Sequence, residues 1–98
     1  MPAHVDASAI LVAETKRQYH NNPITHAIAK LVVNTLDNEH HERMGTGLGR
    51  HEREIAKMSA AMGVVLAAKD ADGTPTIERL IMEAGEAANA RLAAELLP

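Results

Sequence analysis

Residues 55–68 read IAKMSAAMGVVLAA, and this stretch decides the fold. Between Met58 and Ala68, over eleven residues, the only polar side chain is Ser59. A helix that is apolar nearly all the way round is buried in its protein, and eleven residues are too few to cross a bilayer. The stretch therefore predicts a central helix over about residues 50–69, enclosed by neighbouring chain on every side.

Two faces of this helix differ in the size of their side chains. At 100° per residue one stripe carries the larger residues, namely Ile55, Met58, Met62, Val65 and Leu66. A second face carries only small residues, namely Ala56, Ala60, Gly63 and Ala67. Small residues let two helix backbones approach closely. We expect this second face to be an interface, through which the chain associates with itself.

Turn-forming residues divide the rest of the chain around the central helix. Asn22 and Pro23 form a break and a helix start, GTGLG at 45–49 is a connector, and DADGTP at 70–75 is a turn. These signals predict helices over about 7–20, 23–44, 50–69 and 75–97. Alternation typical of strands is absent. The segment 1–22 is the least certain, because Ile10, Leu11 and Val12 point in three directions, and it is either a helix or an arm donated to another subunit.

The helices predicted on either side of the central one are amphipathic. For 75–97 the apolar face consists of Ile77, Leu80, Ile81, Ala84, Ala88 and Leu92. For 23–44 the face expected to meet the core consists of Ile24, Ala27, Ile28, Leu31 and Thr35. Continued along the helix, that second face becomes acidic at its end.

These patterns together predict one all-α domain over residues 1–98. It would be a small bundle of three or four helices around a central antiparallel hairpin, formed by 23–44 and 50–69. Its core is thin, because the chain has no Phe or Trp, a single Tyr, and 18 alanines among its apolar residues. A chain of this size with so little large apolar surface is marginal alone. We therefore expect an oligomer, with itself and another protein as partners.

Charge and composition argue against several classes of function. A net charge of −3 does not provide the positive surface that binds phosphate backbones, so nucleic acid is not an expected partner. Without cysteine there are no disulfides or thiolate metal sites, which is compatible with a reducing compartment. The N-terminal residues lack the basic region of a signal peptide. We expect a cytoplasmic protein without a membrane partner.

The one stretch with concentrated chemistry is NEHHERMGTGLGRHEREI, residues 38–55. Helical geometry places Glu39 and Glu42 on one face, opposite His51 from the next helix, a set able to hold a divalent metal ion or to transfer protons. The glycine-rich connector makes a poor rigid scaffold for such a site. A structural interpretation is favoured, in which the histidine is satisfied by a carboxylate. A third interpretation is a pH-sensitive contact with another subunit.

No catalytic or cofactor-binding set stands out, so the favoured function is a small non-enzymatic protein–protein interaction module. It would be a regulator, an inhibitor or an assembly subunit that acts as a homo-oligomer. The alternative is a metal-binding protein or metal-dependent hydrolase that uses Glu39, Glu42 and His51. The third class is a DNA-binding regulator, because residues 53–65 faintly resemble a helix-turn-helix. That class is disfavoured, since residues 58–68 offer no Arg, Lys, Asn or Gln to read a base.

Overall fold

The structure, a computed structural model, describes residues 4–97 and is helical almost throughout. Its helices are α1 (Ala7–Asn21), α2 (Pro23–Met44), α3 (Arg50–Ala67) and α4 (Thr76–Leu96). Residues 4–97 contain no strand; a single bridge between Lys69 and Pro75 closes the turn that joins α3 to α4. The predicted all-α class is confirmed, and the four helices are compatible with a small helical bundle.

Local capping explains where the first two helices begin and end. Asp6 precedes α1, and its Oδ1 accepts a hydrogen bond from the N–H of Ala9 at 3.2 Å. Asn22 does the same for α2, where Pro23 occupies the first turn and has no N–H to satisfy. Gly45 ends α2 with φ +77°, a left-handed conformation that glycine adopts without steric cost. The signals at Asn22, Pro23 and Gly45 are local, which is why the sequence located these boundaries, whereas the cap at Asp6 was not predicted.

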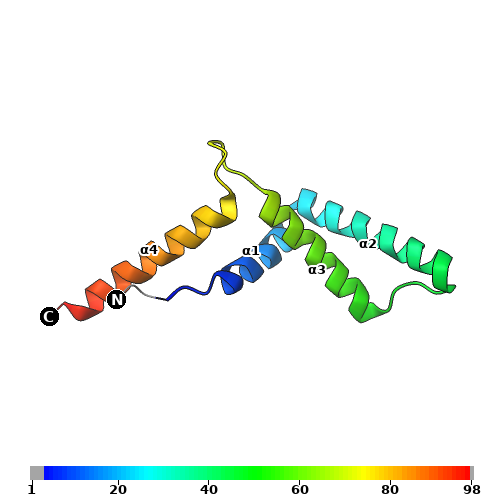
Figure 1. Cartoon of the computed structure of the whole chain (residues 1–98), viewed down its shortest axis with the longest axis horizontal. Coiled ribbons are helices and arrows are strands. Elements are labelled where there is room, and N and C mark those ends of the chain that lie inside the picture. The colour runs from blue at the N-terminus through cyan, green and yellow to red at the C-terminus, as the bar shows by residue number, and fades with distance from the viewer. Residues whose placement is uncertain (1–3, 98) are drawn as a thin grey trace.

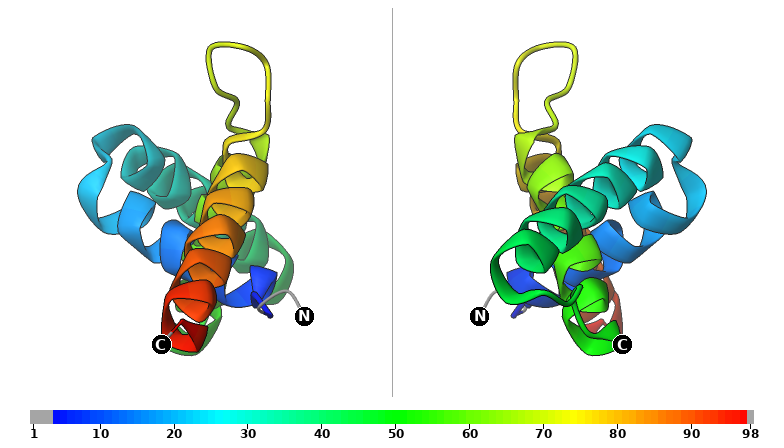
Figure 2. Two further views of the ribbon diagram at one scale, coloured as in Figure 1. Left: turned by 90° about the vertical axis from the view of Figure 1, so that its left-hand side faces the viewer. Right: turned by 90° about the vertical axis from the view of Figure 1, so that its right-hand side faces the viewer.

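The four helices do not close into a globule. Helices α1, α2 and α3 pack against one another, whereas α4 packs against α1 and the end of α3 and then extends away from the body (Figure 1). The chain reverses direction between α2 and α3 through residues 45–49, and the turn between α3 and α4 projects from the body (Figure 2). The radius of gyration is 18.1 Å, against about 13 Å for a compact chain of this length. The molecule is elongated, 66 × 29 × 20 Å.

The core of this arrangement is small and built from short side chains. Its buried apolar residues are Ala29, Val33, Ala61, Val65 and Ile77. Two threonines, Thr15 and Thr25, are also fully covered. The Thr15 hydroxyl donates to the carbonyl of Leu11 at 2.8 Å, so its burial leaves no unpaired polar atom. Short side chains at these positions let the helices approach closely, but they remove little apolar area from water.

The predicted orientation of α2 is wrong. Its buried face carries Thr25, Ala29 and Val33, whereas the predicted core stripe of Ile24, Ala27, Ile28, Leu31 and Thr35 is exposed along its whole length. Both faces carry apolar residues, and periodicity alone does not tell which one the chain itself covers. The smaller residues face α1 and α3, because they permit the closer approach.

The prediction that residues 55–68 are enclosed on every side is also wrong. Ala61 and Val65 are buried, but Ile55 and Leu66 on the same predicted stripe are 54% and 53% exposed. Three helices surround α3 only in part, because α4 contacts one end of it. The apolar face predicted for α4 is confirmed as its less exposed side, from the buried Ile77 to the half-buried Leu92. Segment 7–20 forms α1 and packs against α2 and α3; residues 1–3 of the predicted arm lie outside the described residues.

A larger side chain at Ala61 is expected to destabilise the fold. Ala61 is fully buried, so Ala61→Leu must displace neighbouring helix atoms, which costs about 1–3 kcal/mol of unfolding free energy. Ala87 lies exposed within α4 and provides the matched control, because Ala87→Leu adds the same atoms in solvent. Urea denaturation followed by circular dichroism measures both variants. Equal midpoints for A61L and A87L would contradict the described core.

Candidate functional site

The three residues predicted to form a metal site do not come together. Glu39 and Glu42 on α2 and His51 on α3 are all exposed. Within residues 4–97, no three His, Asp or Glu side chains gather closely enough to hold a metal ion. The two helices diverge toward their connecting loop, as Figure 1 shows. The geometry therefore gives no support to metal or acid–base chemistry by this set.

The polar side chains that organise this tip are Asp37 and His40. Oδ1 of Asp37 accepts a hydrogen bond from the backbone N–H of Leu48 at 2.8 Å and lies 3.9 Å from Nη1 of Arg53. Nδ1 of His40 bonds to the carbonyl of Thr46. Both contacts tie the glycine-rich loop back onto α2. These contacts were not predicted from the sequence, because a helical wheel describes a single helix and does not show that the following loop folds back onto it.

The predicted interface of small residues on α3 is divided between two environments. Ala56 and Ala60 are partly buried, whereas Gly63 and Ala67 are exposed. A Cβ added at Gly63 would meet nothing within 4 Å. No helix within residues 4–97 packs closely over the second half of this face. It remains open for an intermolecular contact.

An apolar cleft lies where α2 and α3 diverge. Its volume is about 250 Å³, and its walls are formed by Leu36, His40, Arg43, Leu48, Glu52, Ile55 and Ala56. Apolar carbons dominate these walls. A cleft of this kind accepts an apolar side chain rather than a polar substrate.

A second uncovered apolar surface is the outer face of α2, which carries Ile24, Ala27, Ile28, Leu31 and Thr35. Ile24 is 71% exposed, Leu31 is 67% exposed and Ile28 is 39% exposed. Val32, also exposed, borders the face on one side. In Figure 1, α1 and α3 both lie below α2, and no helix is drawn above it. Contiguous apolar surface of this kind marks an interaction site.

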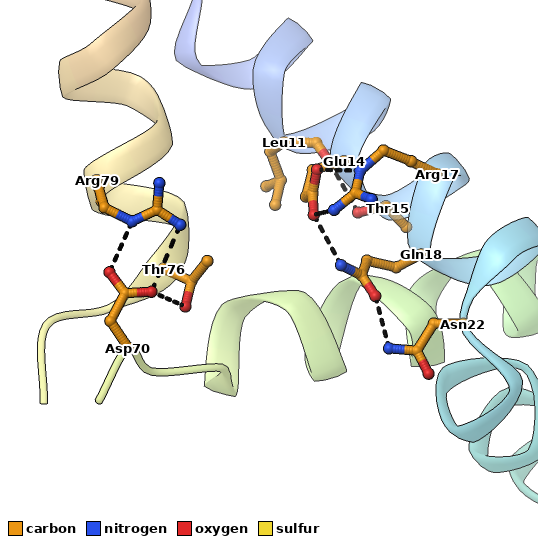
Figure 3. Close-up of polar contacts among 9 residues, drawn as sticks. All are labelled: Leu11, Glu14, Thr15, Arg17, Gln18, Asn22, Asp70, Thr76 and Arg79. Carbon is orange, nitrogen blue, oxygen red and sulfur yellow. Dashed lines mark hydrogen bonds and ion pairs between the residues drawn. The ribbon is translucent and has the colours of Figure 1, made fainter. Parts of the chain in front are cut away.

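Two polar clusters lie near the place where α1 and the start of α4 come together, one within the turn and α4 and the other along α1 (Figure 3). In the first, Asp70 accepts hydrogen bonds from the Thr76 hydroxyl at 2.8 Å and from Nε of Arg79 at 2.7 Å. Arg79 also donates to Glu83 one turn further along α4. These contacts lower the pKa of the Asp70 carboxyl, chiefly through Arg79. The cluster fixes the angle at which α4 leaves the turn.

The second cluster is a ladder of side chains along α1. Glu14 accepts two hydrogen bonds from the Arg17 guanidinium, at 2.6 and 2.9 Å, and a third from Gln18. Gln18 in turn accepts from the Asn22 side chain. Arg17 is the main cause that lowers the pKa of Glu14 below its ordinary value, and the partial burial of the carboxylate opposes it. Asn22 thus joins the ladder to the cap of α2.

A cavity of about 230 Å³ lies between the two clusters, lined by Glu14, Gln18, Asn22, Thr25, Val64, Val65, Ala68, Thr76, Ile77 and Leu80. Glu14 is its only ionisable wall residue. A general acid or base works best with a pKa near the operating pH, whereas the pKa of Glu14 is lowered by its ion pair. The arrangement therefore suits a structural role, in which Glu14 orients Gln18 and the α1–α2 corner.

Comparison of the chain with known protein families, with characterised proteins and with solved structures found no match. No helix within residues 4–97 is both long enough and apolar enough to span a membrane. A function for this chain is therefore inferred from the surfaces described above.

Substitution of Gly47 is expected to release the loop from α2. A Cβ at Gly47 would lie 2.6 Å from Oδ1 of Asp37, so Gly47→Ala must displace the carboxylate from the Leu48 N–H. Loss of that hydrogen bond costs about 0.5–1.5 kcal/mol of stability. Gly63→Ala is the control, because a Cβ at that position meets nothing within 4 Å and should not lower the melting temperature. Thermal melts of both variants measure the difference.

A double substitution makes this test specific. In a chain that already carries Asp37→Ala, Gly47→Ala has no carboxylate to displace, so its additional cost is expected to be near zero. An unchanged cost in that background would show that the Asp37 contact does not hold the loop.

Acid is expected to weaken the α1 ladder in a defined pH range. The folded pKa of Glu14 is lowered, so its ionised form contributes stability above the unfolded pKa of about 4.3, and that contribution is lost as the pH falls through the folded pKa. Between about pH 5 and 3 the urea midpoint of the wild type should therefore fall faster than that of Glu14→Gln. Asp70 acts in the same direction, so the variant keeps some acid sensitivity. Glu86→Gln, an exposed control on α4, should follow the wild type; a Glu14→Gln profile parallel to the wild type would contradict the role of the ion pair.

Proposed function

We propose that this chain is a small non-enzymatic protein–protein interaction module that acts as a homo-oligomer. Its role would be that of a regulator, an inhibitor or an assembly subunit, and its absence of cysteine is compatible with the cytoplasm. The observation that carries the proposal is the exposed surface of the isolated chain. The accessible area is 7086 Å², whereas a compact monomer of 10.5 kDa exposes about 5,400 Å².

The difference of about 1,700 Å² is large for a chain of this size. One partner in a standard protein–protein interface buries about 800 Å². The excess is therefore about twice the area that one partner buries in such an interface. Association with a second copy and with a different protein are both compatible with it.

The kind of surface also supports binding rather than chemistry. Exposed large apolar residues occur on all four helices, for example Val12 on α1, Leu31 on α2, Leu66 on α3 and Leu96 on α4. The ionisable groups whose pKa values depart from their ordinary values all do so through hydrogen bonds and ion pairs with neighbouring side chains or backbone. Such contacts stabilise a scaffold, and apolar faces between them provide contact area.

Native mass is the direct test of this proposal. Light scattering coupled to size exclusion is expected to give at least twice the chain mass of 10.5 kDa at micromolar concentration and neutral pH. The physical reason is the apolar area that a single copy leaves in water. A particle of 10.5 kDa at all concentrations up to the millimolar range would contradict the homo-oligomer.

A further inference from the structure

We infer that the outer face of α2 is a homodimer seam, in which α2 of one copy packs antiparallel against α2 of a second copy. The inference rests on the proposed function and names the surface and the partner. The face consists of Ile24, Ala27, Ile28, Leu31 and Thr35, all exposed, whereas the buried residues of α2 are Thr25, Ala29 and Val33. A second helix therefore reaches it without displacing any part of the described fold.

The first argument for a second copy is that the face is self-complementary. In a twofold interface the same patch occurs on both sides, so a charge near the axis meets its own copy. Between Pro23 and Leu36 the only Lys, Arg, Asp or Glu on α2 is Lys30, and helical geometry places it about 120° from Ile24, off the face. The face offers only uncharged side chains to its own copy.

The second argument concerns size and shape. The single chain exposes about 1,700 Å² more than a compact protein of its mass, twice what one partner in a standard dimer buries. Along the helix Ala27 lies between the larger Ile24, three residues before it, and Leu31, four residues after it. A small residue between large ones lets the side chains of one helix insert into the grooves of another.

The charges at the end of the face indicate the relative direction of the two α2 helices. Further along α2 the same face ends in Glu39 and Glu42. At 100° per residue, both fall on the side of the helix that carries Ile24. A parallel pair would hold these carboxylates against their own copies, and like charges at such spacing repel. An antiparallel pair centred near Ala27 and Ile28 separates the two copies of Glu42 by about 40 Å along the helix axis. The antiparallel pair also orients the two helix dipoles in opposite directions.

In this arrangement Ile24 of one copy lies against Leu31 of the other, and Ile28 lies near the twofold axis. Ile24, which is 71% exposed in a single chain, and Leu31, which is 67% exposed, thus cover each other. The cleft between α2 and α3 and the open half of the α3 face remain uncovered. These are the surfaces left for a different protein.

A charge on the axis is expected to separate the copies. Ile28→Asp places two carboxylates against each other in every dimer, so the dimer dissociation constant should rise by roughly 100-fold or more. Val12→Asp is the matched control, because Val12 is 42% exposed and Ile28 is 39% exposed, but Val12 lies on α1. Sedimentation equilibrium measures both dissociation constants. Equal weakening by the two variants, or by neither, would overturn the inference.

Disulfide crosslinking tests the geometry, since the chain has no cysteine and any introduced thiol is unique. In the antiparallel seam A27C and I28C lie within reach of their own copies and should form covalent dimers on mild oxidation. E42C is expected not to crosslink, because its copy is about 40 Å away. S59C, on an exposed part of α3, reports on association through that helix instead. Circular dichroism of each variant verifies that it is folded.

Each crosslinking result distinguishes one arrangement of the two copies from another. Crosslinks at A27C or I28C without crosslinks at E42C and S59C support the antiparallel seam. Crosslinking by E42C indicates a parallel pair, crosslinking by S59C indicates a seam on α3, and a dimer that crosslinks at none of these positions uses another face. Each of these three results overturns the inference and leaves the proposed homo-oligomer standing. A monomeric wild type overturns both.

Discussion

The close approach of helices through small side chains is the constraint on which the rest of this structure depends. Ala29 on α2 and Ala61 on α3 are fully buried, and no Phe or Trp is available to fill a wider gap. Short side chains bring backbones together but remove little apolar area from water. The fold therefore forms with a narrow core and leaves much of its apolar surface exposed. The apolar surface that the fold leaves exposed is the reason why we propose a binding function.

Helix α2 shows this connection most directly, because it is apolar on two nearly opposite faces. The chain uses the face with the smaller residues, Thr25, Ala29 and Val33, and leaves Ile24, Ile28 and Leu31 in solvent. Exposing large residues while burying small ones is unfavourable for an isolated domain. It becomes favourable when a second copy covers the larger residues. The polar contacts at Asp37 and Asp70 hold the loop before α3 and the turn before α4, and those at Glu14 lie along α1.

The sequence predicted local features well and long-range ones only in part. Boundaries followed from residues such as Asn22, Pro23 and Gly45, whose effects act within one turn, and α2 begins and ends where those signals predict. The amphipathic face of α4 was also correct. The orientation of α2 was wrong, because hydrophobic periodicity identifies an apolar face without showing whether the same chain or another molecule covers it.

The candidate site was harder to predict for a related reason. Wheels placed Glu39, Glu42 and His51 toward a common interior, but they assume that two helix ends stay together. The ends diverge, and the polar groups that matter are Asp37 and His40, which reach backward to the loop. Such contacts depend on the path of five connector residues, and glycine-rich connectors restrict that path very little. The exposed surface area could not be predicted from the sequence either, because it depends on how all the helices pack together.

The measurement that tests the central claim most directly is the dependence of thermal unfolding on protein concentration. If a second copy completes the burial of apolar surface, folding and association are coupled, and the melting temperature rises steadily as the protein is concentrated from the micromolar to the millimolar range. A melting temperature that stays constant over that whole range would show that the single chain is complete by itself, which contradicts the account.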